Sequence, residues 1–264
     1  MAKLTQAAGF KAAFMGDGAV SVSRLGYPDF GFVDRADVID RAREVCSSTP
    51  MPIVVDVGTG YGNALTMQRT VKELETAGVA GAFFEDQVAP KKCGHIRGRS
   101  LISVGEMVGK IQAACDARQD DDFVLIARTD ALAISGLNAA IDRINTFGEA
   151  GADIVFIDAL ESMEELTVAP QLSNYPMMVN MLEGGKTPYL PASELAKLGY
   201  KMVIWPETLM YAGFSAMQTV ATELQQKGTI SEQTRNNMTN FQEMCHFLQL
   251  DELYALEEKY AEEQ

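Results

Sequence analysis

Short apolar runs alternate with amphipathic segments along most of the chain. Seven runs have the length and apolar character of buried β-strands, and they lie at residues 11–14, 52–56, 81–85, 124–128, 154–157, 177–179 and 202–205. Segments with helical spacing follow them at 34–46, 65–77, 104–117 and 137–150, from residue 163, from residue 192 and after Pro206. This alternation predicts an α/β fold with a parallel sheet covered by helices.

The number of strand-and-helix units favours a closed barrel. Seven evenly spaced units in about 200 residues fit a (β/α)8 barrel of the TIM type better than an open doubly wound sheet. The chain opens in what reads as the end of a helix at residues 2–8. We therefore expect a barrel domain over residues 1–228 that lacks its first strand, or in which another segment takes that strand's place. Residues 229–264 predict one or two amphipathic helices that either cap their own barrel or pack on a neighbouring subunit.

Polar residues recur where the predicted strands end, at Asp56, Glu85, Arg128, Asp158 and Asn180. The carboxyl ends of barrel strands converge on the face where active sites are built, so we expect a shared site. Asp56 and Glu85, with no histidine nearby in sequence, favour a hard cation, Mg²⁺ or alternatively Mn²⁺. Arg128 suits a substrate carboxylate held by two hydrogen bonds. Gly16 and Gly18 would let backbone N–H groups approach an anion.

Residues 82–99 join one of the apolar runs to a basic loop that carries a single cysteine, Cys93. We expect the neighbouring Lys91, Lys92 and His95 to favour the thiolate and to lower the pKa of Cys93. Because the loop is charged and contains glycine, we expect it to be mobile. The remaining cysteines fall on helical patterns and are expected to be packing residues: Cys46, Cys115 and Cys245.

Net charge and composition exclude several classes of binding partner, cellular location and metal. The 264 residues carry a net charge of −14, so broad affinity for nucleic acid or anionic membranes is not expected. No apolar run approaches the length of a membrane span, and the N-terminal residues do not read as a secretory signal. The cysteines form no CxxC pair, which together with the missing signal predicts reduced thiols in the cytoplasm. The two histidines are far apart, which argues against zinc.

Four motifs together resemble the isocitrate lyase/phosphoenolpyruvate mutase superfamily. They are LGYPD near the start, DVGTGYGN and ARTDA after predicted strands, and EDQVAPKKCGH at the basic loop. The resemblance covers residues 9–228, and the KKCGH loop is similar to that of the lyases, in particular the 2-methylisocitrate lyase and 2,3-dimethylmalate lyase group. It implies a (β/α)8 barrel, a Mg²⁺ cofactor, and a homotetramer in which a C-terminal helix is exchanged between neighbours.

The resemblance also implies roles for individual residues. Asp56 would be the main metal carboxylate, and Asp29 and Glu85 would hold metal-bound waters. Cys93 would be the general acid, supported in the loop by Lys91 and His95. The substrate-binding positions would be Gly16, Asp17, Gly18, Arg128, Asp158, Asn180 and Glu183.

The chain departs from the family pattern at several positions. The usual DxDTGYG motif has a second aspartate where this chain has Gly58, which removes one water-holding carboxylate and is expected to weaken metal binding. Phe14 replaces a frequent tyrosine, Gly16 a serine, and Phe83 a frequent histidine. Ser215 replaces an arginine of the methylisocitrate lyases that suits a third carboxylate, which argues against a tricarboxylate substrate.

These features predict a Mg²⁺-dependent carbon–carbon lyase that cleaves a 2-hydroxy dicarboxylate, of the alkylmalate or methylisocitrate type, to a 2-oxo acid and a carboxylate. Cys93 would protonate the departing carbanion, and a thiol pKa near neutral would suit that step. One alternative is a hydrolase that converts oxaloacetate to oxalate and acetate. Another is a degenerate homologue that binds a dicarboxylate without turnover. A phosphonate mutase is disfavoured because Cys93 is present.

Overall fold

The structure is a computed structural model that describes residues 1–261, and its centre is one parallel sheet. Seven strands pair in chain order: β1 (Ala13–Met15), β2 (Ile53–Asp56), β3 (Gly81–Glu85), β4 (Val124–Thr129), β5 (Ile154–Ile157), β6 (Met177–Asn180) and β7 (Met202–Ile204). β1 and β7 are the two edges of this sheet. The described residues thus form a nearly closed TIM-type barrel of seven strands, and the predicted fold class is confirmed.

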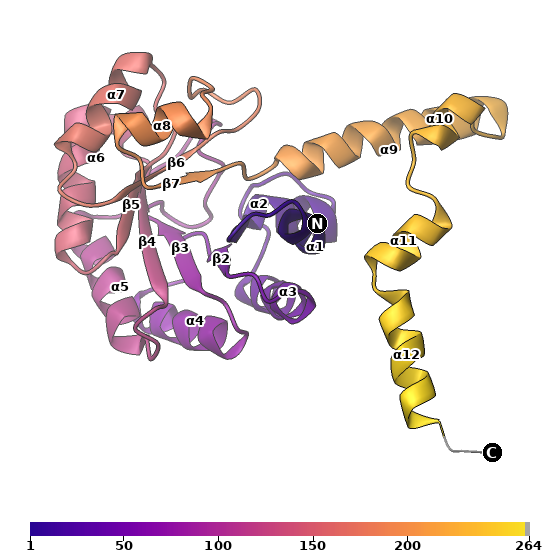
Figure 1. Ribbon diagram of the computed structural model, residues 1–264. Coiled ribbons are helices and arrows are strands. Elements are labelled where there is room, and N and C mark those ends of the chain that lie inside the picture. Colours follow the sequence, from indigo (N-terminus) through magenta and orange to yellow (C-terminus); the bar gives the residue numbers. More distant parts are fainter. Residues whose placement is uncertain (262–264) are drawn as a thin grey trace. The chain divides into compact units, whose positions relative to one another are not determined.

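Helices follow the strands and cover the outside of the sheet (Figure 1). Those before β7 are α1 (Ala2–Ala7), α2 (Asp17–Val20), the π-helix η1 (Ser21–Leu25), α3 (Arg35–Ser48), α4 (Ala64–Thr76), α5 (Val104–Ala117), α6 (Leu132–Glu149), α7 (Met163–Leu172) and α8 (Ala192–Leu198). Polar caps fix several of these boundaries. Asp34 and Asp37 form a capping box at α3, Ser162 and Glu165 form another at α7, and Gly199 ends α8 in the left-handed conformation.

Two predicted element starts differ from the structure by two residues or more. β1 lies two residues later than the predicted start at residue 11, because Ala13–Met15 are the residues that pair with β2. α6 begins at Leu132 rather than at residue 137, but Gly136 has non-helical angles (φ 80°, ψ 175°) and interrupts the helix there. The amphipathic pattern therefore identified only the segment that follows this break.

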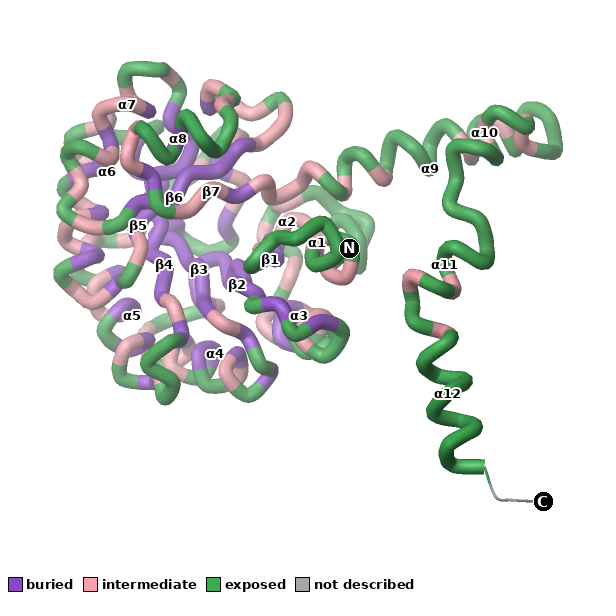
Figure 2. Tube along the Cα trace, in the orientation of Figure 1, coloured by how far each residue is buried: buried purple, intermediate pink, exposed green. Residues whose placement is uncertain are grey.

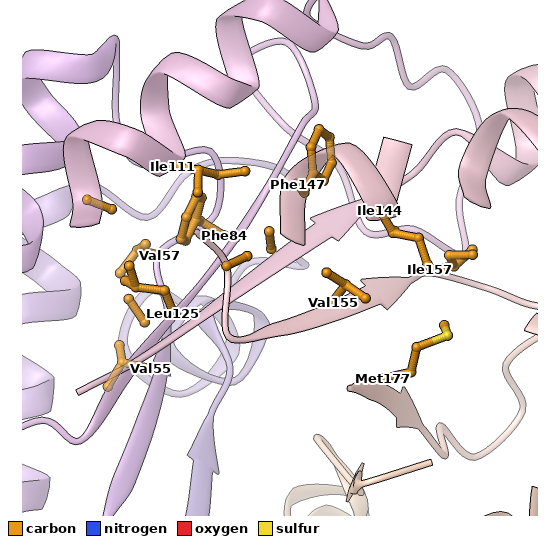
Figure 3. Packing of buried hydrophobic residues seen from close by; sticks show 14 of the residues in the cluster. Val55, Val57, Phe84, Ile111, Leu125, Ile144, Phe147, Val155, Ile157 and Met177 are labelled. Carbon is orange, nitrogen blue, oxygen red and sulfur yellow. The ribbon is translucent and has the colours of Figure 1, made fainter. Parts of the chain in front are cut away.

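Side chains alternate between the two faces of each strand, and this produces two apolar layers. Side chains on the outer face pack against the helices, as Val55, Phe84 and Leu125 do in Figure 3. Side chains on the inner face form a separate cluster inside the barrel, made of Val54, Phe83, Ile126, Phe156, Met178 and Ile204. The strands are accordingly the most continuously buried part of the chain (Figure 2). The inner cluster fills the barrel below its carboxyl end.

The chain divides into two compact units, Met1–Leu209 and the residues from Met210 onward. The predicted boundary at residue 228 falls instead at the end of α9 (Thr208–Lys227). The second unit continues with α10 (Glu232–Asn236), α11 (Phe241–Phe247) and α12 (Leu250–Tyr260), and residues 262–264 of the predicted extension lie outside the described part. None of α9–α12 has a buried side chain among the described residues. No helix in residues 1–261 is both long and apolar enough to cross a membrane.

Candidate active site

A polar layer lies directly above the inner apolar cluster. Because side chains alternate between the two faces of a strand, the residue two positions after each inner apolar residue also points inward. This rule relates Val54 to Asp56, Phe83 to Glu85, Ile126 to Arg128, Phe156 to Asp158 and Met178 to Asn180. All five polar residues are buried at the carboxyl ends of their strands. The predicted convergence of polar side chains at this end of the barrel is therefore present.

One half of this layer is a group of carboxylates around a buried ammonium group. Lys91 Nζ donates to Asp17 Oδ1 at 2.7 Å and to Asp29 Oδ2 at 2.9 Å. Asp56 and Glu85 lie close enough to interact with the same ammonium group. Burial lowers the pKa of Lys91, but the four surrounding carboxylates outweigh burial and raise it well above its usual value. Lys91 is therefore a fixed positive charge in this group.

Asp56 and Glu85 are buried carboxylates whose surroundings suit a bound cation. Burial, and in addition the neighbouring Asp17, raises the pKa of Asp56 well above its usual value. Burial likewise raises the pKa of Glu85, and neither of its oxygens accepts a hydrogen bond within residues 1–261. Buried carboxylates without donors are costly, and a bound cation would remove that cost. The observation supports the predicted metal side of the site.

The oxygen donors fit Mg²⁺ in a partly hydrated form. In the described part of the chain, no three acidic, histidine or cysteine groups converge as a ready-made coordination shell. Mg²⁺ usually keeps several waters and binds one or two carboxylates directly. Asp56 is the best placed direct ligand, because its Oδ1 is already oriented by the N–H group of Gly58 at 2.8 Å. Asp29 and Glu85 can then bind metal-held waters.

The two residues after Glu85 anchor the basic loop. Asp86 accepts hydrogen bonds from Thr129 Oγ1 at 2.6 Å and from Asp130 N at 3.0 Å, which ties β3 to β4. The Gln87 side chain accepts from Lys92 N at 3.0 Å and donates to Lys92 O at 2.8 Å. Both roles are structural, so within the Glu-Asp-Gln sequence Glu85 is the residue left to serve a cation, and the other two position the loop.

Arg128 is held by a second set of carboxylates. Its Nε and Nη2 atoms donate to Asp130 at 2.9 Å each, and Nη2 also donates to Asp158 Oδ2 at 2.9 Å. Nη1 lies 3.3 Å from Glu85 Oε2. Nη1 makes no hydrogen bond with the described residues and forms an ion pair with Glu85, so this edge of the guanidinium faces the carboxylate group and can donate to a substrate carboxylate there.

The loop with Cys93 lies directly over Arg128 and Asp158. A Cβ atom added to Gly94 would be 1.4 Å from Asp158 Oδ2 and 2.6 Å from Arg128 Nη2, so only glycine allows this approach. The next loop residue, His95, contacts a different segment: its Nδ1 accepts a hydrogen bond from Lys186 N at 3.2 Å. The loop therefore covers the guanidinium and has to move before a substrate can reach it.

The predicted low pKa of Cys93 is wrong. Burial raises the pKa of this thiol to about 11; the His95 N–H group and Arg128 oppose the effect, and the carboxylates of Asp29 and Asp158 add to it. The basic neighbours do not act as expected because Lys91 is paired with carboxylates and burial lowers the pKa of His95. Cys93 is therefore a protonated thiol at neutral pH.

The other predicted substrate positions divide into two groups. Asn180 is buried at the end of β6, while Glu183 accepts hydrogen bonds from Thr208 Oγ1 at 2.6 Å and Tyr189 OH at 3.1 Å. Gly16 precedes the four-residue helix α2, and Asp17 directs its carboxylate to Lys91. Glu183 is thus hydrogen-bonded to Thr208 and Tyr189, whereas Asp17 belongs to the carboxylates around Lys91.

Sequence reasoning missed Glu207, which follows β7. Its Oε1 lies 3.2 Å from the Cβ position of Gly18, and its Oε2 is buried without a hydrogen bond in residues 1–261. Burial, with the nearby Asp29 and Asp17, raises the pKa of Glu207 to about 7. Its place near the carboxyl end of the last strand, β7, was the available signal.

Comparison with known proteins finds a family that covers most of the chain. The family model described as phosphoenolpyruvate phosphomutase matches residues 1–225. The chloroplastic carboxyvinyl-carboxyphosphonate phosphorylmutase of Arabidopsis thaliana is 42% identical over 98% of this chain and 78% of its own length. The 2,3-dimethylmalate lyase of Eubacterium barkeri is 40% identical over 98% of this chain and 90% of its own length.

Solved structures agree with this placement. Oxaloacetate acetylhydrolase in complex with 3,3-difluorooxalacetate superposes with a TM-score of 0.91 at 29% identity, over 98% of this chain and 88% of that one. A 2,3-dimethylmalate lyase, described as a PEP mutase/isocitrate lyase superfamily member, gives 0.90 at 30% identity over 98% and 86%. Phosphonopyruvate hydrolase with oxalate and Mg²⁺ gives 0.88 at 26% identity over 98% and 90%.

Proposed function

This chain belongs to the PEP mutase/isocitrate lyase superfamily, and from that premise we propose that it is a carbon–carbon lyase acting on a 2-hydroxy dicarboxylate. The products would be a 2-oxo acid and a carboxylate. The observation that carries the proposal is the protonated thiol of Cys93, which its loop holds over Arg128 and beside the buried carboxylate group. This arrangement provides an acid next to a place for an anionic substrate.

Mg²⁺ is the proposed cofactor, with Mn²⁺ as a substitute. Asp56 would bind it directly, and Asp29 and Glu85 would bind its waters. When bound, the ion would lower the pKa of the substrate hydroxyl group and neutralise carboxylate charge. The buried oxygens of Glu85, which have no hydrogen-bond donor in residues 1–261, support this assignment. The oxalate and Mg²⁺ bound in phosphonopyruvate hydrolase support it too.

Residues of the chain would bind the substrate, remove its hydroxyl proton and protonate the product. Arg128, oriented by Asp130, binds a substrate carboxylate through Nη1, which lies 3.3 Å from Glu85 Oε2 and makes no hydrogen bond within residues 1–261. Glu207, whose pKa is about 7, takes the hydroxyl proton near neutral pH. As the bond between the second and third carbons breaks, its electron pair stays on the leaving carboxylate fragment. Cys93 Sγ gives its proton to that carbon, while the closed loop excludes water.

A coupled assay for 2-oxo acid tests the proposal. Purified protein is incubated with 2,3-dimethylmalate, 2-methylisocitrate, other alkylmalates and phosphonopyruvate, with EDTA or with added Mg²⁺. We expect Mg²⁺-dependent pyruvate from an alkylmalate, and no turnover of phosphonopyruvate. The proposal fails if no hydroxy acid is cleaved. A dicarboxylate that raises the melting temperature without turnover would then identify a binding homologue.

Oxaloacetate hydrolysis is the second candidate, because the oxaloacetate acetylhydrolase structure superposes with a TM-score of 0.91. Oxaloacetate would be converted to oxalate and acetate with the same metal side of the site. Proton NMR of the products distinguishes the two activities, since only the hydrolase releases acetate from oxaloacetate.

We also propose that the chain assembles as a homotetramer in the cytoplasm. The helices of the second unit expose large apolar side chains that would be covered in an assembly: Phe241 is 81% exposed and Tyr260 is 73% exposed. The four cysteines are free, which is typical of a reducing compartment. Sedimentation velocity checks the assembly, and a monomer at micromolar concentration would contradict it.

A further inference from the structure

The backbone at Gly58 leaves a space that another residue fills. Gly58 follows Asp56 by two positions and has a φ of +52°. A Cβ atom there would lie 3.3 Å from Asp17 Oδ2 and 3.6 Å from Lys91 Cε. The carboxylate of Asp17 therefore occupies the place into which a side chain at position 58 would extend.

Asp17 reaches this place from a different part of the barrel. Gly58 comes from the loop after β2, whereas Asp17 begins α2, directly after β1. Only 6% of Asp17 is exposed, and its carboxylate interacts with that of Asp56. The DxDTGYG pattern expected from the family resemblance would place an aspartate at position 58; this chain has Gly58 there, and the carboxylate of Asp17 lies in the same space.

We propose that Asp17 supplies the carboxylate that position 58 lacks, and that it binds the divalent cation directly or through a water. The inference rests on the proposed Mg²⁺-dependent function. It changes the expectation from the sequence, in which Gly58 weakens metal binding and Asp17 contacts substrate. The Asp17 carboxylate completes the group formed by Asp56, Asp29 and Glu85.

A simple ion pair with Lys91 does not account for Asp17. Lys91 Nζ is already paired with Asp29, whose two oxygens lie 2.8 and 2.9 Å away. Five carboxylates gather around this one ammonium group: Asp17, Asp29, Asp56, Glu85 and Glu207. A second cation, Arg128, forms an ion pair with Glu85 at 3.3 Å but is also held by Asp130 and Asp158.

Buried like charges in excess are strongly unfavourable unless they are paired. Glu85 provides an independent observation, because it is 0% exposed, neither of its oxygens accepts a hydrogen bond among the described residues, and its ion pair with Arg128 Nη1 is 3.3 Å long. A divalent cation between these groups satisfies both observations. A carboxylate at position 17 would help to bind such an ion; without one, Asp17 shares the single ammonium group of Lys91 with the other carboxylates.

A reciprocal swap tests the proposal by metal binding without substrate. The dissociation constant for Mn²⁺ is measured by electron paramagnetic resonance for wild type, Asp17→Asn, Asp17→Gly, Gly58→Asp and the double variant Asp17→Gly/Gly58→Asp. We expect Asp17→Asn and Asp17→Gly to weaken binding by about 10- to 100-fold, the range found when groups that support a metal are removed. Aspartate tolerates positive φ better than most residues, so the double variant can fold.

The double variant Asp17→Gly/Gly58→Asp tests whether the two positions can supply the same carboxylate. It should bind Mn²⁺ at least tenfold more tightly than Asp17→Gly, because its carboxylate returns to the same space. Asp153→Asn is the matched control: Asp153 pairs with Arg118 at 2.8 Å just before β5, and this change should leave the affinity unaltered. Melting temperatures without metal show whether each variant is folded.

The outcomes separate this inference from the proposed function. If wild type binds no Mn²⁺, the proposed metal-dependent function fails and the inference fails with it. If wild type binds Mn²⁺ and Asp17→Asn binds it equally well, only the inference is wrong, and Asp17 is a partner of Lys91 alone. A double variant no better than Asp17→Gly would show that the two positions do not share one role.

Discussion

Gly94 is the position at which a single methyl group should separate binding from catalysis. In Gly94→Ala the new Cβ would start 1.4 Å from Asp158 Oδ2, so the loop or the carboxylate must move by about 2 Å to reach an ordinary contact. Asp158 is held by Arg128 at 2.9 Å, while the loop lies at the surface, so we expect the loop to move. That movement displaces the adjacent thiol of Cys93.

The size of the effect follows from the displacement. Misplacing a reacting group by about 1 Å can cost about 100-fold in rate, so kcat/KM should fall by at least that factor, or about 2.7 kcal/mol of transition-state stabilisation. The affinity for Mn²⁺ should stay within about twofold of wild type, because the carboxylates around Lys91 are not displaced. Iodoacetamide should alkylate Cys93 faster, since the thiol becomes more exposed. These three measurements together distinguish an opened loop from a damaged barrel.

Gly109→Ala is the matched control. Gly109 lies within α5 and nothing is within 4 Å of its Cβ position, so alanine there should stabilise the helix by up to about 1 kcal/mol and leave kcat/KM unchanged. A Gly94→Ala enzyme with wild-type kcat/KM and an unchanged alkylation rate would refute the reasoning. It would mean that the close contact between Gly94 and Asp158 is not part of the catalytic state.

Three further predictions concern the proposed acid, the carboxylate-binding residue and the proton acceptor. Cys93→Ser should lower kcat by about 10²- to 10⁴-fold while oxalate binding, measured by calorimetry, is retained; full activity in this variant would exclude the thiol as the acid. Arg128→Lys cannot reproduce the two parallel hydrogen bonds to Asp130, so KM should rise and the free energy of unfolding, from urea titration, should fall by about 3 kcal/mol; an unchanged KM would contradict substrate binding by the guanidinium. A proton acceptor must be ionised, and the pKa of Glu207 is about 7, so kcat should fall as the pH drops below about 7. Glu207→Gln should lower kcat and remove that acidic limb from the pH profile, and a variant that keeps the limb would assign it to another group.

The sequence predicted the barrel because its signal is local and repeated. Strands β3 and β5 have the predicted bounds, since each is a continuous apolar run that ends at a polar residue. The same argument placed Asp56, Glu85, Arg128, Asp158 and Asn180 at one end of the barrel, because period-two alternation and parallel pairing leave little freedom. Local pattern was enough wherever a residue's position depends on its own strand.

Predictions that depended on contacts between distant segments were less successful. The pKa of Cys93 was judged from its sequence neighbours, but burial and the pairing of Lys91 with Asp17 and Asp29 decide it. Glu207 was missed for the same reason, since its neighbours in space come from the loop after β1. Linear sequence shows which charges are adjacent along the chain, whereas the pKa depends on which charges are adjacent in the fold.

Asp29 connects the two halves of the site. Its side chain pairs with Lys91 in the carboxylate group, and its carbonyl oxygen accepts a hydrogen bond from Cys93 N at 3.3 Å. A change in charge around Lys91 therefore reaches the backbone of the residue that carries the proposed acid. Lys91 stabilises the carboxylates of the cation side by pairing with them. Because it is paired, its ammonium group does not favour the thiolate of Cys93. Burial is the main cause of the protonated state of Cys93, and the carboxylates of Asp29 and Asp158 add to it. Asp29 therefore contributes both to the proposed metal side and to the state of the proposed acid.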